Sequence, residues 1–186
     1  MHLFLRADGT AGIGVGHLMR GLALVEGWLA RGGTATLLGV APVAVARRFE
    51  AAGAEVLEVA WDPRPSPEEV LRLPVVAARS GPGSWFVVDG YRLDHTYSAA
   101  LRATGASVAV VDDTAESSAY DCDLLLNQNL GAERLAYRIN STAELLRGAR
   151  YVLLRNEFRA RPWPRREHPP VADRVLVTMG GGDPDN

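Results

Sequence analysis

A glycine-rich segment that ends in a histidine stands near the start of the chain. It runs from Asp8 to Gly16, and His17 opens the amphipathic stretch that follows. Glycine lets a backbone come close to a ligand, and the free amides at a helix start suit a phosphate or a developing anion. The helix dipole disfavours a charged imidazole, so we expect a neutral His17 that can accept a proton, with Arg20 one turn further on. A capping or packing role for His17 is the alternative that position alone leaves open.

The spacing of these glycines differs from the dinucleotide-binding fingerprint. Counting from Gly12, His17 occupies the position of the third glycine, and the second predicted strand ends at Gly39-Val40 without an acid to hold a ribose. We therefore expect no NAD, and nothing else in the sequence indicates a cofactor. The four histidines and one cysteine are too far apart in sequence to match zinc-ligand spacing, so we expect no metal.

Polar residues follow three successive predicted strands and form a second group of candidates. They are Asp89 and Tyr91, then Asp112 and Asp113, then Asn127, Gln128 and Asn129. In an open parallel sheet, ligands bind in the crevice at the carboxyl ends of the strands. Each aspartate alone could instead be a helix cap or a turn former, and adjacent residues of an extended segment point apart, so Asp112 and Asp113 need not act as a pair.

The remaining reactive residue types offer little chemistry. All 20 basic residues are arginine, which excludes a lysine Schiff base and a P-loop lysine. Cys122 lies between two aspartates, which raise a thiol pKa, so we expect no nucleophilic role. We expect His2, His95 and His168 to be exposed to solvent.

These candidates need a scaffold, and apolar runs predict one in which strands and helices alternate. The predicted strands cover residues 3–5, 36–38, 55–59, 85–88, 107–111, 123–126 and 151–154, and the predicted helices cover 18–29, 43–52, 68–79 and 95–103. This order predicts an α/β fold with a Rossmann-like parallel sheet and helices on both faces.

Composition indicates where this scaffold ends. Residues 1–158 form the predicted domain, and residues 159–173 are rich in proline and arginine, as in an extended linker. A new strand is predicted at Arg174–Met179, followed by a glycine loop, so residues 174–186 would begin a second domain. Because that strand and loop lack a helix to cover them, we expect the natural protein to continue.

Length, charge and hydropathy exclude several classes of protein. The chain has 186 residues, 47% hydrophobic residues and a net charge of −2, which gives no indication of disorder or of a nucleic-acid partner. The first residues lack the pattern of a secretion signal, and no apolar run approaches the ~20 residues that a membrane span needs. We expect a cytoplasmic protein without a membrane partner.

The opening motif and the strand-end motifs resemble those of a known family. The matching segments are Arg6-Ala7-Asp8-Gly9, Ile13-Gly14-Val15-Gly16-His17-Leu18-Met19-Arg20, Asp89-Gly90-Tyr91, Val111-Asp112-Asp113, Cys122 to Asn129, Gly148 to Phe158 and Met179 to Pro184. The chain resembles the UDP-2,4-diacetamido-2,4,6-trideoxy-β-L-altropyranose hydrolases of pseudaminic acid biosynthesis and the related spore-coat polysaccharide proteins. That family is similar to two-domain glycosyltransferases of the GT-B type, including the lipid II-forming N-acetylglucosaminyl transferase.

The resemblance implies that the chain is the N-terminal half of a GT-B-type fold with a UDP-sugar in the cleft between the halves. It implies release of UDP without a metal, by attack of water at the anomeric carbon with inversion, and it makes His17 the catalytic residue. The candidate substrate-binding residues are Arg6, Asp8, Gly14, Gly16, Arg20, Asp89, Tyr91, Asp112, Asp113, Asn127, Asn129 and Gly181. The other half would hold most uridine and diphosphate contacts, so we expect these residues alone to bind UDP weakly and to be nearly inactive.

Two other functions fit the same sequence. A glycosyltransferase of this fold would pass the sugar to an acceptor other than water. A binding domain without catalysis would retain the fold but would not need His17 and Tyr91 together.

Overall fold

The structure is a computed structural model that describes residues 1–139, 142–160, 170–172 and 174–177. Its strands are β1 (His2–Ala7), β2 (Thr34–Leu38), β3 (Glu55–Leu57), β4 (Trp85–Asp89), β5 (Ser107–Val111), β6 (Leu124–Asn127) and β7 (Glu144–Arg147). Its α-helices are α1 (Gly16–Leu29), α2 (Val43–Ala52), α3 (Glu68–Leu71), α4 (Pro74–Arg79), α5 (His95–Arg102) and α6 (Asn156–Arg159), with 3-10 turns η1 (Ala132–Arg134) and η2 (Ala149–Tyr151).

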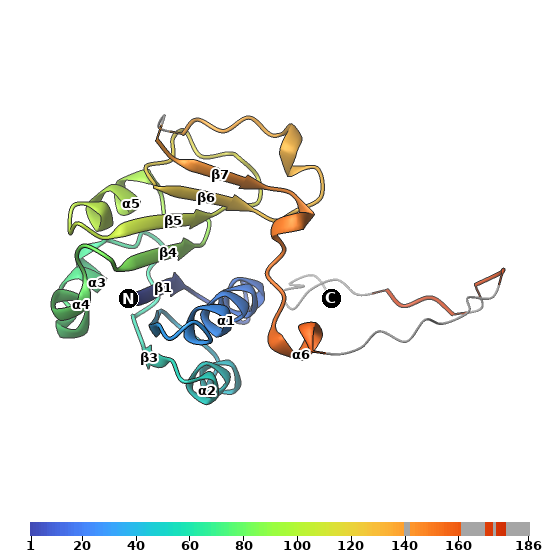
Figure 1. The fold of residues 1–186 in the computed structure, drawn as a ribbon, viewed down its shortest axis with the longest axis horizontal. Helices are drawn as coiled ribbons and strands as arrows, with labels where there is room; N and C mark the ends of the chain where they lie inside the picture. The colour runs from blue at the N-terminus through green and yellow to red at the C-terminus, as the bar shows by residue number, and fades with distance from the viewer. Residues whose placement is uncertain (140–141, 161–169, 173, 178–186) are drawn as a thin grey trace.

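All seven strands form one parallel sheet in the order β3-β2-β1-β4-β5-β6-β7 (Figure 1). The first six strands follow the Rossmann order 3-2-1-4-5-6. Strands are added in one direction from β1 to β3 and in the opposite direction from β4 onward, so the strand order reverses between β1 and β4. The predicted α/β fold is therefore confirmed. The register places Ala7 opposite Asp89 and Asp89 opposite Val111, so β1, β4 and β5 end side by side. This shared end of the sheet is where the candidate residues meet.

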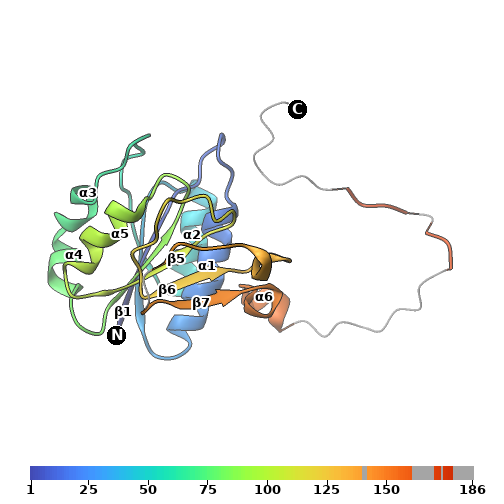
Figure 2. The ribbon, with the colours of Figure 1, turned by 90° about the horizontal axis from the view of Figure 1, so that it is seen from above.

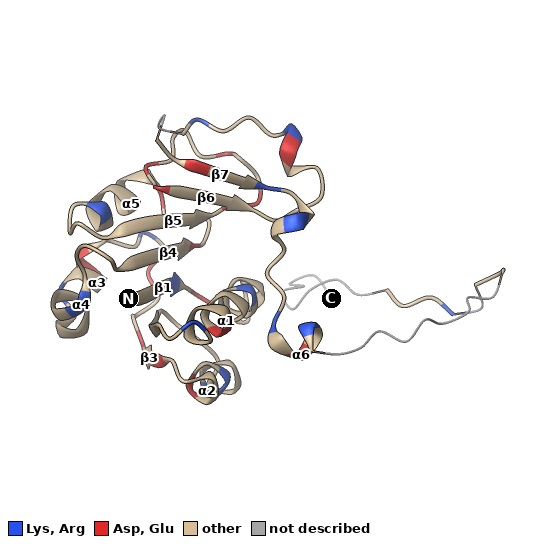
Figure 3. Cartoon of the chain, in the orientation of Figure 1, with Lys and Arg blue, Asp and Glu red and all other residues tan. Residues whose placement is uncertain are grey.

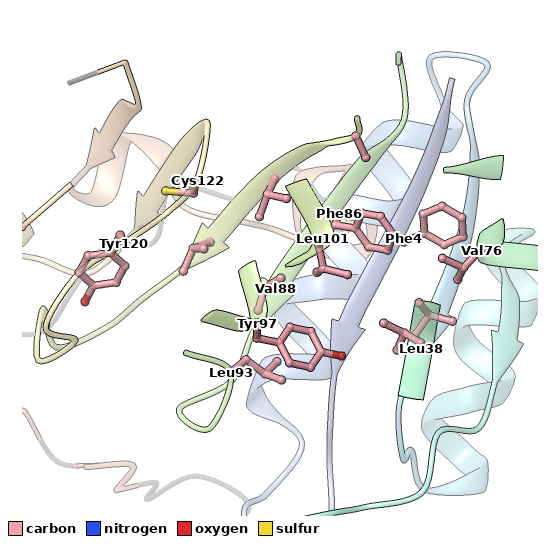
Figure 4. Packing of buried hydrophobic residues seen from close by; sticks show 14 of the residues in the cluster. Phe4, Leu38, Val76, Phe86, Val88, Leu93, Tyr97, Leu101, Tyr120 and Cys122 are labelled. Carbon is pink, nitrogen blue, oxygen red and sulfur yellow. The ribbon is translucent and has the colours of Figure 1, made fainter. Parts of the chain in front are cut away.

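Helices cover both faces of the sheet, as Figure 2 shows, with α1 and α2 on one side and α3, α4 and α5 on the other. Alternate residues of β1 serve the two faces: Leu3, Leu5 and Ala7 join the core under α1, whereas Phe4 joins the opposite core. Phe4 and Phe86 stack there with their ring centroids 4.8 Å apart, close to Tyr97 and Leu101 of α5 (Figure 4). Charged residues lie mainly on helices and loops, and β4 and β5 carry almost none along their length (Figure 3). Burial on both faces explains why these strands are nearly uninterrupted apolar runs.

Two predictions about local structure are wrong. The single helix predicted over 68–79 is two short helices, because Pro74 has no amide proton to donate and forces Leu73 into an extended conformation. The last strand of the sheet is β7, not the predicted 151–154. β7 lies at the sheet edge and carries a charged residue at each end, which hides its two leucines from a search for apolar runs.

The segment predicted as that late strand forms η2 and then has no regular structure over residues 152–155. Its side chains alternate between half-buried and exposed, as in a strand, but no described residue pairs with its backbone in a ladder. It leads to α6, where Glu157 pairs with Arg48 of α2 at 2.8 Å. The chain thus crosses the outside of α1 and α2 after leaving the sheet.

The predicted linker and second domain fall mostly outside the described residues. Residues 161–169, 173 and 178–186, which include Gly181 and His168, are among those not described. Residues 174–177 lie in no strand, and Val175, Leu176 and Val177 are exposed. The division into two domains stays a prediction.

Candidate functional site

A cavity of about 370 Å³ opens at the carboxyl ends of β4 and β5, beside the point where the strand order reverses. The first turn of α1, the loop after β4, the start of α5 and the loop after β5 enclose it. Its lining includes His17, Arg20, Gly90, Tyr91, Leu93, His95, Ser98, Asp112, Asp113, Glu116, Ser117 and Tyr120. In doubly wound sheets this is the position at which ligands bind.

One arginine joins the ends of the two strands. Arg20 Nε and Nη2 donate to the two carboxylate oxygens of Asp89, each at 2.6 Å, and Nη1 donates to Asp113 at 2.7 and 2.9 Å. The Asp89 side chain is 1% exposed and that of Arg20 is 12% exposed. The pKa of Arg20 is raised because both carboxylates stabilise its charge against the cost of burial. Arg20 therefore connects α1 to the ends of β4 and β5, and its guanidinium nitrogens donate to Asp89 and Asp113.

The two aspartates respond differently to Arg20. Burial raises the pKa of Asp89, although Arg20 opposes this effect. The pKa of Asp113 is lowered, because hydrogen bonds from Arg20, Asn129 and Tyr91 together outweigh the effect of burial. Asp113 is thus held as an anion whose oxygens already accept several hydrogen bonds, which makes it a poor general base.

His17 lies in the first turn of α1, where Val15 is the N-cap residue and no side chain caps the helix. Its ring stands edge-on to Tyr91, with the ring centroids 5.1 Å apart. Neither imidazole nitrogen has a hydrogen-bond partner among the residues that the structure describes. The Tyr91 hydroxyl donates to Asp113 at 3.3 Å. This contact sets the phenol ring beside His17 at the mouth of the cavity.

Asp112 and Asn127 are engaged in shaping loops. Asp112 accepts from the amides of Thr114 and Ala115, at 3.0 and 2.7 Å, and from the Tyr120 hydroxyl at 2.9 Å. Burial and the Asp112 charge raise the pKa of Tyr120. Asn127 is fully buried and donates to Tyr137 at 2.7 Å.

Asn129 connects this loop to the charged cluster. Its amide group donates to Asp113 at 2.8 Å, and its backbone amide donates to Asn127 at 2.9 Å. Asp113 therefore accepts hydrogen bonds from the side chains of Asn129, Tyr91 and Arg20.

Arg6 and Asp8 lie one strand away, at the end of β1. Arg6 is fully buried and donates to Asp8 at 2.8 Å and, through Nε and Nη2, to Glu69 at 3.1 and 3.0 Å. Asp8 also accepts from the Val40 amide and from Arg92, each at 3.0 Å. These contacts fasten β1 to its neighbours, and they leave Arg6 outside the lining of the cavity.

The glycine loop folds back on itself between β1 and α1. Gly14 has a φ of +73°, in the left-handed region, and its amide donates to Thr10 at 2.8 Å. Gly16 starts α1, and a Cβ placed there would have no atom within 4 Å. The loop therefore leaves open space at the start of the helix.

Sequence reasoning missed part of the cavity wall and misjudged two histidines. His95 is half-buried and lines the cavity, and His2 is 7% exposed with its ring nitrogens on the hydroxyls of Thr34 and Thr36, at 2.7 and 3.0 Å. Both were expected in solvent. His2 is buried because β1 is an interior strand, and burial lowers its pKa.

The loop after Asp113 was also missed, although its polar run from Thr114 to Ser118 could have indicated it. Cys122 is fully buried, and burial with the Asp123 charge raises the pKa of its thiol to about 11. Within the described part of the chain, no group of three or more His, Cys, Asp or Glu side chains is placed to hold a metal ion. No helix in the same part is long and apolar enough to cross a membrane.

Comparisons with known proteins support the fold. No protein-family model and no curated protein matches the chain. Among solved structures, MurG from Acinetobacter baumannii is similar, with a TM-score of 0.50 and 11% sequence identity, and the match covers 74% of this chain and 44% of that one. The chain thus spans less than half the length of that MurG chain. The likeness shows that this chain shares the fold of part of that structure.

Proposed function

We propose that the chain belongs to an enzyme that binds a UDP-activated amino or acetamido sugar and releases UDP by hydrolysis. The observation that carries this proposal is the His17–Tyr91 pair at the mouth of the cavity, with both imidazole nitrogens open to a ligand. The fold shared with MurG supports a nucleotide sugar as the ligand class. Gly16, at the start of α1, leaves open space next to this pair.

The reaction assigned to these residues is a direct displacement. His17 accepts a proton from water as the water oxygen bonds to the anomeric carbon. The bond from that carbon to the diphosphate oxygen breaks, and UDP leaves with the electron pair. Attack from the face opposite the diphosphate inverts the anomeric centre. Tyr91, fixed by Asp113, orients the water or the sugar.

The carboxylates suit a supporting role in this scheme. Asp89 is buried under Arg20, and Asp112 and Asp113 each accept several hydrogen bonds. A base needs a free lone pair directed at the reacting water, and His17 supplies one without breaking a contact between described residues. His17 is therefore the candidate base, and the aspartates hold its surroundings in place.

A glycosyltransferase is the second candidate, because the cavity extends well beyond His17. It continues to His95, Ser98 and Ser117, and 370 Å³ can hold a group much larger than water. In that case the proton lost to His17 would come from an acceptor hydroxyl. The uridine and most diphosphate contacts would come from residues after the described domain, Gly181 among them.

The test is UDP release from UDP-sugars by the longest reading frame that contains these residues, with and without sugar acceptors. We expect UDP release in water alone, and a loss of ~10²–10⁴-fold in kcat for His17→Asn. His95→Asn is the matched control, since it changes a histidine of the same cavity. Release that requires an acceptor would select the transferase, and release that is unchanged by His17→Asn would refute the assigned base.

A further inference from the structure

Tyr91 has one hydroxyl hydrogen, and a neighbouring carboxylate holds it. The hydroxyl donates to Asp113 Oδ2 at 3.3 Å. A phenol carries a single O–H donor, and its oxygen can also accept hydrogen bonds. With its hydrogen directed at Asp113, Tyr91 can act toward a ligand only as an acceptor.

The acceptor positions of Asp113 are filled. An ionised carboxylate offers about four lone pairs and no donor. Arg20 Nη1 donates to both oxygens, at 2.7 and 2.9 Å, and Asn129 donates to Oδ1 at 2.8 Å. The Tyr91 hydroxyl takes the fourth position. Burial acts against ionisation, but the hydrogen bonds and charge of Arg20 lower the pKa of Asp113, so at neutral pH it accepts from Tyr91 and cannot donate to it.

His17 presents a second acceptor to the same space. Its ring centroid lies 5.1 Å from that of Tyr91, and both side chains line the large cavity. A neutral imidazole has one nitrogen with a free lone pair, and neither nitrogen of His17 is hydrogen-bonded to a described residue. A small molecule at the mouth of the cavity therefore meets two acceptors, an imidazole nitrogen and a phenol oxygen.

Two acceptors around one nucleophile make its number of hydrogens important. Water has two, so it can donate one to His17 and one to Tyr91 while a lone pair of its oxygen points to the anomeric carbon. An alcohol has one, so it can donate to His17 but then places its alkyl group against the Tyr91 oxygen. That oxygen is left without a donor, which is unfavourable once the sugar covers the site.

We propose that Tyr91, with its hydrogen held by Asp113, is a second hydrogen-bond acceptor for the nucleophile and selects water over an alcohol. The inference rests on the proposed function, because it takes the nucleophile to lie between His17 and Tyr91. Asp113 is a positioning residue in this scheme, since it acts through Tyr91.

The proposal fixes the path of each hydrogen in the reaction. The hydrogen that faces His17 moves to the imidazole nitrogen as the water oxygen bonds to the anomeric carbon. The hydrogen that faces Tyr91 stays on the new hydroxyl of the sugar. The bond from the anomeric carbon to the diphosphate oxygen breaks, and UDP leaves with the electron pair.

Competition between water and methanol measures the selection. The longest reading frame that contains these residues is incubated with UDP-N-acetylglucosamine or UDP-glucosamine in water that contains methanol, and mass spectrometry gives the ratio of methyl glycoside to free sugar. Tyr91→Phe keeps the ring and removes the acceptor, so this ratio should rise by ~5–10-fold. We take the lower part of the range for an unsatisfied acceptor, because Tyr91 is 73% exposed in the free protein. The same exposure predicts a melting temperature near that of the wild type.

Asp113→Asn tests the carboxylate while the phenol stays in place. The amide oxygen can keep the bonds from Asn129 and from Arg20 at the Oδ1 position, which leaves an amide donor facing Tyr91 and frees the hydroxyl hydrogen. The methyl glycoside ratio should therefore rise in this variant as well.

Tyr151→Phe is the matched control. The Tyr151 hydroxyl accepts a hydrogen bond from Arg150, and Tyr151 does not line the cavity beside His17. The same loss of a phenol oxygen should leave the ratio unchanged there.

The hydrogen bond also has a readout that needs no activity. Burial, with the charge of Asp113 and its hydrogen bond, raises the pKa of Tyr91. The chain has five tyrosines, and with carbon-13 at Cζ the Tyr91 signal is the one that Tyr91→Phe removes. Its pKa should lie above the ordinary value of about 10 in the wild type and fall in Asp113→Asn. A pKa that Asp113→Asn leaves unchanged would overturn the inference.

The outcomes separate this inference from the proposed function. UDP release with a methyl glycoside ratio that Tyr91→Phe changes by less than about twofold keeps the hydrolase and rejects the selection of water. An equal rise of the ratio in Tyr151→Phe rejects it too. No UDP release from either sugar by the wild type contradicts the proposed function and the inference together.

Discussion

Replacing Arg20 by glutamine removes a cation that pairs with the aspartates after β4 and β5, and it leaves the nearly buried carboxylate of Asp89 without this counter-ion. Breaking a buried ion pair by removing one partner costs about 3–5 kcal/mol. We expect a value near the lower limit, about 3 kcal/mol, because Asp113 is 17% exposed and can be reached by water. For a protein of this length, 1 kcal/mol lowers Tm by about 2–4 °C, so Arg20→Gln should melt roughly 6–12 °C below the wild type.

The loss should depend on pH in a direction that the pKa shifts determine. Burial raises the pKa of Asp89, and Arg20 is the main opposing influence. Without Arg20 the folded protein binds a proton at Asp89 more tightly than the unfolded chain does, so protonation stabilises the folded state. The deficit of Arg20→Gln should therefore shrink as the pH falls from 8 to 5. Asp113, whose pKa is lowered, costs the wild type stability only as the pH falls below the unfolded value of about 3.9.

Thermal and urea unfolding of the wild type, Arg20→Gln and the double variant Arg20→Gln/Asp89→Asn provide the measurement. Asparagine removes the uncompensated charge, so the double variant should recover part of the lost stability. A loss below 1 kcal/mol at pH 7, or a deficit that grows on acidification, would show that Asp89 does not depend on Arg20 as argued.

Three further changes probe other parts of the structure. His17→Asn should leave Tm nearly unchanged while kcat falls, because the ring makes no hydrogen bond to described residues; an early-melting variant would make His17 structural. Asp94→Ala removes the cap that accepts from the Thr96 and Tyr97 amides and should cost about 1 kcal/mol in urea unfolding, with His95→Ala as the neighbouring control. Gly39→Ala should be severely destabilised, visible as loss of soluble protein, since its φ is +154° and a Cβ would lie 1.9 Å from the Ala7 carbonyl oxygen; a normally folded variant would contradict that geometry.

The sheet and the gathering of polar residues at its carboxyl end could be predicted because both follow from local patterns. Buried parallel strands are apolar runs, and their order with helices implies the layers. Once the strands are parallel, the residues just after each strand must share one edge. Asp89, Tyr91 and Asp113 indeed lie together there.

The pairing inside this group could not be predicted from sequence. Arg20 was expected to contact substrate, yet its position one turn into α1 brings its guanidinium between two strand ends that are 69 and 93 residues away in sequence. The role of Arg20 as a substrate contact stays a prediction, and in this structure its donors face Asp89 and Asp113. A similar long-range effect buries His2, whose neighbours Thr34 and Thr36 belong to the adjacent strand.

The contacts at the strand ends divide the polar residues into two kinds, and this division bears on where chemistry can occur. The charged residues of one kind form ion pairs with one another or with neighbours at the strand ends; they are Arg6, Asp8, Arg20 and Asp113. Moving any of these side chains toward a ligand would break an existing ion pair. His17 breaks no such contact between described residues when it turns toward a ligand, and it lines the cavity at the carboxyl ends of β4 and β5. A side chain without hydrogen bonds to its neighbours, surrounded by groups that are paired with one another, is an arrangement suited to proton transfer. His17 is therefore the candidate base because its neighbours are paired with one another as well as because it lies at the start of α1.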